Sequence, residues 1–157
     1  YAEVGCPGWG MYKEAKKSKK NIYFITNKNK NFWDCGYRKS KINKMENCLL
    51  LSKNKFNFNL IDIKNIKDDF FSYIGFYNYI DHLEKPNLFF NKIFNKTNSI
   101  GIIVKLLKNS KTDIQHCTTW TRKSIIFLCK KFNYKLINKN FKLSNTGYNF
   151  FLLRRDA

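Results

Sequence analysis

Two separated sets of residues have the types and spacing that chemistry requires. The first is the segment EVGCPGWG at 3–10, where an acid is followed by three glycines and then by a helix-like run. Glycines let a backbone approach a ligand closely because no Cβ intervenes. The acid can accept hydrogen bonds from polar groups of that ligand. A strand, a glycine-rich turn and a helix in this order are typical of nucleotide-like cofactor binding in open α/β sheets.

The second set contains the two histidines of the chain, His82 and His116, together with Asp81. Each histidine follows a predicted strand, at the strand end where open α/β sheets present ligand-contacting groups. Imidazole titrates near neutral pH, so either histidine could act as a general base. The alternatives are that His82 caps the following helix, that His116 is a packed loop anchor, and that Asp81 is a solvated turn residue.

Strand-like and helix-like runs alternate along the chain and indicate how these residues are positioned. Strands are predicted at 1–4, 21–26, 48–51, 70–77, 100–104, 134–141 and 148–153, and helices at 11–17, 40–45, 86–95 and 122–132. Thr121 is the expected cap of the last helix, whose apolar stripe contains Ile125, Ile126, Leu128 and Cys129. This order predicts an α/β fold: a Rossmann-like, mostly parallel sheet with helices on both faces and a C-terminal antiparallel hairpin.

Length and composition set the class of protein. The 157 residues suit a single domain over 1–157, and the short first strand suggests that an amino-terminal part is missing. No apolar run is long enough to span a membrane, so a soluble, cytoplasmic protein is expected. The five cysteines contain no Cys-x-x-Cys pair, which favours reduced thiols over a disulfide framework or a metal site.

The charge of the chain has two explanations. Lys and Arg total 30 against 11 Asp and Glu, giving a net charge of +19 that could serve a polyanionic partner. The lysines are scattered, however, and accompany abundant Asn, Ile, Phe and Tyr, all of which have AT-rich codons. We favour codon bias, and nucleic acid remains the less favoured partner.

Three stretches resemble the class I S-adenosylmethionine-dependent methyltransferases of the methyltransferase-domain superfamily, in the family's order. EVGCPGWG at 3–10 looks like the acid-x-Gly-x-Gly-x-Gly loop that holds the methionine part of the cofactor. YIDHLEKP at 79–86 looks like the family's acid-His-Leu-x-x-Pro segment after the fourth strand, and QHCTTWTRKS at 115–124 resembles its His-then-Thr/Ser stretch. The resemblance covers nearly the whole chain, and the middle stretch is the most specific.

The resemblance implies a methyltransferase that acts on a small-molecule or sugar-like acceptor, with S-adenosyl-L-methionine as cofactor and no metal. The catalytic candidates are His116, His82 and Asp81. The cofactor-binding candidates are Glu3, Gly5, Cys6, Gly8, Gly10 and Asn27. Two departures stand against full activity, because Pro7 replaces a usual glycine and Asn27 stands near the strand end where the family has an acid that binds the ribose. Losing a charged acceptor costs about 1.5 to 3 kcal/mol in such a contact.

Two rival functions follow from the same residues. The first is a basic nucleic-acid-binding protein, either an RNA methyltransferase or a catalytically inactive relative. The second is a scaffold that keeps the fold without the cofactor. Tyr77 and Tyr79 either close the methyl site or pack in the core, and Trp9 and Trp120 either stack on a ligand or have structural roles. The oligomeric state is left open.

Overall fold

The computed structural model describes residues 2–4, 17, 21–26, 59–77, 79–83, 85–106, 118–138, 141–143 and 147–155, which form one eight-stranded sheet with helices packed on it. The strands are β1 (Ala2–Val4), β2 (Tyr23–Thr26), β3 (Asn59–Asp62), β4 (Ile74–Tyr77), β5 (Ser99–Lys105), β6 (Tyr134–Leu136), β7 (Phe141–Leu143) and β8 (Tyr148–Arg155). The helices are α3 (Pro86–Ile93) and α4 (Arg122–Phe132), with short 3-10 turns η3 (Ile63–Asn65), η4 (Ile80–His82) and η5 (Phe94–Lys96).

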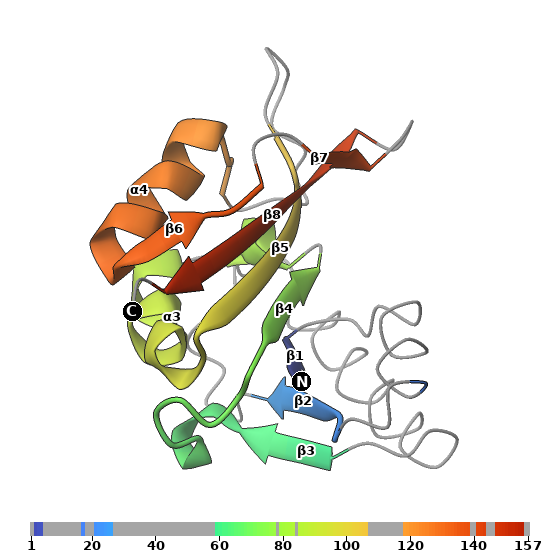
Figure 1. Ribbon diagram of the computed structural model, residues 1–157, viewed down its shortest axis with the longest axis vertical. Helices are drawn as coiled ribbons and strands as arrows, with labels where there is room; N and C mark the ends of the chain where they lie inside the picture. Colours follow the sequence, from blue (N-terminus) through green and yellow to red (C-terminus); the bar gives the residue numbers. More distant parts are fainter. Residues whose placement is uncertain are drawn as a thin grey trace.

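The strand order defines the sheet. It runs β3-β2-β1-β4-β5-β8-β6, and β7 also pairs with β8. Strands β1 to β5 are mutually parallel, whereas β8 is antiparallel to β5, β6 and β7 (Figure 1). The predicted α/β fold with a mostly parallel sheet and a C-terminal antiparallel hairpin is therefore confirmed.

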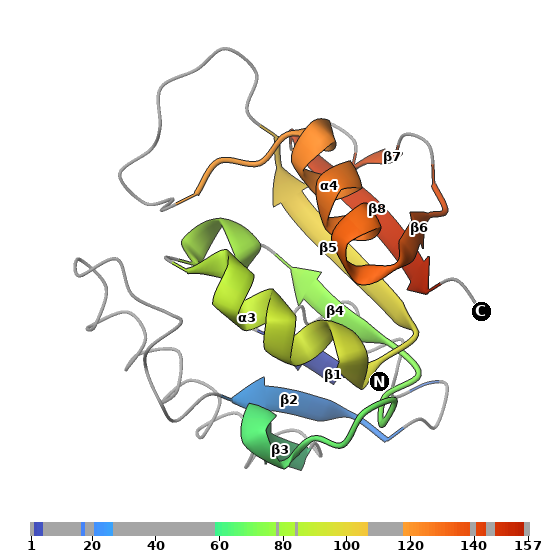
Figure 2. The same cartoon turned by 90° about the vertical axis from the view of Figure 1, so that its left-hand side faces the viewer.

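Helices α3 and α4 cover one face of the sheet, and the main core lies beneath them (Figure 2). Ile74 and Phe76 alternate with Gly75 along β4, so both turn their side chains to the helix face. The Phe76 ring meets Phe89 and Phe90 of α3 edge-on, with centroids 5.7 and 6.3 Å apart. Edge-to-face pairs of this kind add to the burial of apolar area.

The last helix begins and ends where the sequence predicts. Thr121 at its N-cap accepts a hydrogen bond from the backbone N–H of Ser124, and Ser124 Oγ accepts one from Thr121, which completes a capping box. Asn133 ends the helix in the left-handed conformation. Ile125, Leu128 and Cys129 are buried as expected, but Ile126 is 37% exposed, because it lies about 100° around the helix from its neighbours.

The predicted strand at 134–141 is wrong as a single element, because it divides into β6 and β7. Both segments pair with β8, and Asn138 lies between them. Its side-chain amide donates to Phe150 O and its carbonyl oxygen accepts from Leu152 N, both at 2.7 Å. The asparagine side chain thus replaces a backbone ladder where the chain leaves the sheet. The predicted hairpin from β7 to β8 is confirmed, with Gly147 at φ 74°.

The predicted strand at 70–77 is correct only from Ile74 onward. Asp69 adopts a left-handed φ of 52°, and Phe71 makes one isolated bridge to Thr97 before β4 begins. The rings of the aromatic residues preceding β4 pack on β2, since Tyr23 meets both Phe70 and Phe71 edge-on. Packing of large rings explains why an apolar run looked like a longer strand.

The third strand of the sheet is β3 at Asn59–Asp62, which the sequence analysis did not identify as a strand. The predicted elements at 48–51 and 40–45 lie outside the described residues, as does the helix at 11–17 except for Lys17, which is helical. Among the residues that the structure describes, no helix combines the length and apolarity needed to cross a bilayer.

Candidate functional site

The sheet has a topological switch point between β1 and β4. From β1 the chain winds outward through β2 to β3, and from β4 it winds in the opposite direction to β5. The chain therefore continues from these two neighbouring strands toward opposite sides of the sheet. Open α/β sheets bind their ligands at the carboxyl ends of the strands beside such a point.

The glycine-rich segment of the sequence follows directly from one side of this switch point. Val4 ends β1, so the sequence 5–10 follows the carboxyl end of this strand. Glu3 is in register with Phe24 of β2 and Gly75 of β4. The backbone thus brings the predicted acid to the middle of the sheet, one residue before its carboxyl edge.

The other side of the switch point is the η4 turn that follows β4. Asp81 lies in this turn and is only 3% exposed, so the alternative that it is a solvated turn residue is wrong. Tyr79 and Leu83 on either side are also buried. Burial raises the pKa of the Tyr79 phenol well above its usual value, which keeps the hydroxyl protonated. Tyr79 packs against Phe76 and Phe89, as its packing alternative predicts.

Hydrogen bonds fasten the segment before α4 to the same turn. Thr118 donates its backbone N–H to Asp81 O and its hydroxyl to Ile80 O, both at 3.1 Å. The Trp120 indole N–H points to Ile80 O at 3.3 Å and to the Thr118 hydroxyl at 3.0 Å. The Trp120 ring is 6% exposed and meets Phe90 edge-on, which supports a structural role for this side chain. The segments that follow β4 and β5 are thereby held together at the carboxyl edge.

The position of the His82 backbone decides whether this residue caps helix α3. The backbone of His82 ends η4, beside Asp81. Helix α3 begins four residues later with Lys85 at its N-cap and Pro86 at its first position, so the interpretation of His82 as the helix cap is wrong. The remaining predicted site residues lie outside the described part of the chain: Gly5, Cys6, Gly8, Gly10, Asn27 and His116.

Sequence reasoning missed one acid at this edge. Asp62 ends β3 in register with Thr26, the last residue of β2. Neighbouring strands lie about 4.8 Å apart, so Asp62 is one strand away from the position where an acid was expected. Its carboxylate accepts a hydrogen bond from Lys64 N at 3.0 Å, and an ionised carboxylate can accept several hydrogen bonds. The short run NLID, which has two apolar residues and ends in this acid, was the available signal.

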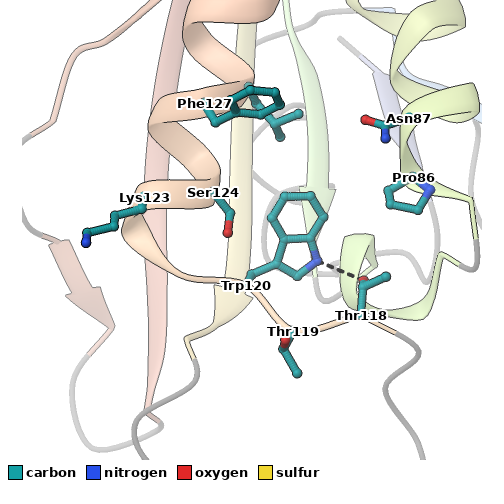
Figure 3. A pocket seen from close by; sticks show the side chains of 9 residues that line it. Pro86, Asn87, Thr118, Thr119, Trp120, Lys123, Ser124 and Phe127 are labelled. Atoms are coloured by element: carbon teal, nitrogen blue, oxygen red, sulfur yellow. Dashed lines mark hydrogen bonds between the residues drawn. The ribbon is translucent and has the colours of Figure 1, made fainter.

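A groove of about 420 Å³ opens between the first turns of α3 and α4 and the segment before α4 (Figure 3). Its volume lies in the range of small-molecule sites. Sequence analysis did not identify it, because its walls come from two helices that are far apart in the chain. The lining residues are Pro86, Asn87, Thr118, Thr119, Trp120, Lys123, Ser124, Phe127 and Leu128.

Comparison with known proteins gives similarity of structure without similarity of sequence. No protein-family model matches the chain, and no curated protein matches its sequence. Among solved structures, it is similar to a protein from Sulfolobus solfataricus assigned to the type 11 methyltransferases, with a TM-score of 0.64 and 16% identity over 99% of this chain and 84% of that one.

Two further solved structures are informative. Magnesium protoporphyrin IX methyltransferase from Synechocystis PCC 6803, solved with bound S-adenosylhomocysteine, superposes with a TM-score of 0.65 and 6% identity over 99% of this chain and 73% of that one. The [4+2]-cyclase SpnF gives a TM-score of 0.65 and 8% identity over 99% and 74%. The second likeness shows that this fold also supports other reactions, so function must be argued from the site.

The strand order, the switch point and these superpositions agree with one another. Superpositions at such low sequence identity establish the architecture alone. The activity must be argued from the site residues. The chain has the fold of the class I S-adenosylmethionine-dependent methyltransferases.

Proposed function

We propose that the chain binds S-adenosylmethionine at the β1–β4 switch point and transfers its methyl group to a small-molecule acceptor. One observation carries the proposal: β1, which the glycine-rich sequence 5–10 follows, pairs with β4, which leads into the turn that contains Asp81. The structures of the magnesium protoporphyrin IX methyltransferase with bound S-adenosylmethionine and S-adenosylhomocysteine support this cofactor for the fold. The compared structures give no support to the nucleic-acid alternative.

The groups at the carboxyl edge suit a cofactor that has an amino group, two ribose hydroxyls and an adenine. Each of these offers N–H or O–H donors that need acceptors. Glu3 belongs to β1, and Asp62 ends β3 beside Thr26. We propose that Asp62 supplies part of the acceptor strength that the acid-free end of β2 lacks. Gly5, Gly8 and Gly10, with Cys6 and Asn27, complete the proposed cofactor contacts.

The bound cofactor supplies a methyl group on a sulfonium, which the acceptor's lone pair attacks in line while the carbon–sulfur bond breaks and its electrons return to sulfur. The chain must hold the acceptor close to the methyl group and in line with the carbon–sulfur bond. Such positioning removes a large part of the activation free energy when the geometry is right. A hydroxyl acceptor also loses its proton, and His82 or His116 would accept it. Asp81 lies in the η4 turn, which Thr118 and Trp120 hold by hydrogen bonds, and it would orient the acceptor or the histidine.

Calorimetric titration of the chain with S-adenosylmethionine and S-adenosylhomocysteine tests the proposal. We expect saturable binding of both compounds, and no measurable heat for Gly8→Val, because a branched side chain would occupy the path of the cofactor. Asp62→Asn should weaken binding by about fivefold to tenfold, since a charged acceptor becomes neutral. Thermal unfolding of each variant serves as the control for folding. Absence of heat with the unaltered chain, or unchanged binding by Gly8→Val, contradicts the proposal.

The cytoplasmic location predicted from the sequence belongs to the same proposal. A methyltransferase that depends on S-adenosylmethionine needs access to the intracellular supply of that compound. Fractionation of cells that express the protein would test the location directly.

A further inference from the structure

The groove between α3 and α4 has an uneven distribution of charge. Among the described residues that line it, Lys123 is the only charged one, and none is an acid. Within the described ranges, Lys123 forms no ion pair or hydrogen bond, and its side chain is exposed. Helices α3 and α4 contain no Asp or Glu in their sequences, and their Lys and Arg side chains give both helices a positive charge. An occupant with a negative charge would be favoured at the Lys123 side.

The rest of the lining combines an apolar floor with short polar groups. Trp120 and Leu128 are buried and form the floor, and Phe127 stands at the rim with 61% of its surface exposed. The lining also includes Thr119 and Ser124, which have hydroxyl groups, and Figure 3 shows Ser124 on the side of α4 that faces Trp120. An apolar pocket with a few polar groups at its edge is the usual form of a small-molecule site.

The groove is attached to the proposed reaction edge by hydrogen bonds. Thr118 lines the groove and donates its backbone N–H to Asp81 O. Trp120 lines it too, and its indole N–H donates to Ile80 O in the same turn. A molecule seated on the Trp120 ring would therefore adjoin the turn that we propose to hold the acceptor.

We propose that this groove binds an organic acid with a flat apolar body, and that such acids are the acceptor class of the enzyme. The exposed Lys123 side chain, which extends away from Trp120 in Figure 3, would turn to pair with the carboxylate, and the apolar body would lie between Trp120 and Phe127. The acceptor role rests on the proposed methyl transfer, whereas binding to the groove can be tested without it. The carboxylate serves for recognition, and the methylated atom lies at the other end of the molecule.

Titration of the full chain with 2-naphthoate, followed by amide and indole N–H signals in NMR spectra, tests the site. Its uncharged counterpart 2-naphthamide has the same apolar body. We expect saturable shifts of the Trp120 indole and the Ser124 amide with both compounds, and about fivefold tighter binding of the acid, the size expected for one exposed charge pair.

Two pairs of variants separate the groove from the general surface. Lys123→Gln should lower the affinity for naphthoate to that for naphthamide, whereas Lys130→Gln, on an exposed part of the same helix, should leave it unchanged. Phe127→Ala should weaken the binding of both compounds, whereas Ile126→Ala, which changes a neighbour outside the groove lining, should not. All four positions are at least partly exposed, so the variants should fold, and their thermal unfolding is the check.

Three results would overturn the proposal. These are equal affinity for the acid and the amide, an unchanged affinity in Lys123→Gln, and shifts that lie away from the groove. Displacement of naphthoate by an oligonucleotide, with shifts spread over the lysines of both helices, would favour nucleic acid instead. If naphthoate binds as expected and the calorimetric titrations show no cofactor, the organic-acid site stands and its role as acceptor site falls.

Discussion

The two halves of the sheet are built differently. Strands β1, β2 and β3 have three or four residues each, whereas β5 has seven and β8 has eight. Helices α3 and α4 pack on the half that contains β4, β5 and β8 (Figure 2). The glycine-rich segment and Asp62 belong to the half with short strands. The comparison suggests that one half supplies the stability and the other supplies most of the cofactor contacts.

The largest effect on stability is expected from removing the Phe90 ring, which lies in the core under α3. Phe90 is fully buried and meets Phe76, Phe94 and Trp120 edge-on. Phe90→Ala should lower the free energy of unfolding by about 3 to 5 kcal/mol, because it leaves a cavity at the junction of α3, β4 and the segment before α4. Denaturant unfolding of the unaltered chain and the variant measures this loss of free energy.

The matched control for that change lies on the same helix. Leu88 is 51% exposed, so Leu88→Ala should change the free energy of unfolding by no more than about 0.5 kcal/mol. Similar losses for both variants would mean that α3 does not anchor the stable half of the molecule.

A second prediction concerns the half with short strands. Without ligand, amide hydrogens of β1 and β2 should exchange faster than those of β5 and β8, because short strands open locally more easily. At a hundredfold excess over its dissociation constant, S-adenosylhomocysteine should add about 2.7 kcal/mol of stability and narrow this difference. Hydrogen exchange read by mass spectrometry measures both effects. In Gly8→Val the ligand should change nothing, and uniform exchange across the unliganded sheet would contradict the division.

The smallest effect is a pH dependence in the stable half. Burial raises the pKa of the Cys129 thiol from 9.0 to about 11. Between these values the unfolded chain loses a proton that the folded chain keeps, so stability should fall as pH rises, by up to about 1.4 kcal/mol per pH unit. The free energies of unfolding of the unaltered chain and of Cys129→Ala, measured between pH 8 and pH 11, should converge as the pH rises. A constant difference between them would show that the thiol does not titrate with folding.

The sequence predicted the elements whose local signals agree with their packing. Helix α4 has a threonine cap, an apolar stripe and an asparagine end, and β5 is rich in β-branched residues, so both were predicted within one residue. The order of elements also indicated the sheet topology. Errors arose where tertiary contacts override local pattern, as at Phe70 and Phe71, whose rings pack on Tyr23 instead of extending β4.

The candidate site was predictable only in part, since it depends on distant segments meeting. The acid-histidine pair after β4 was found because it follows a strong apolar strand. Asp62 was missed because β3 is short and polar at its start. The groove was missed because its walls are separated by about thirty residues of sequence, as with Asn87 and Thr118. The buried state of Asp81 also depends on segments that no local pattern reveals.

The side chain of Asn138 has a consequence for how the chain could change. It holds β8 at two successive bonding positions, Phe150 O and Leu152 N, between the rungs formed by β6 and those formed by β7. A one-residue shift in the pairing register would turn every side chain of β8 to the opposite face of the sheet. The two hydrogen bonds of Asn138 would be lost in such a shift, which makes it costly. Residues inserted between Asn138 and Phe141 should therefore leave the alignment of the longest strand unchanged.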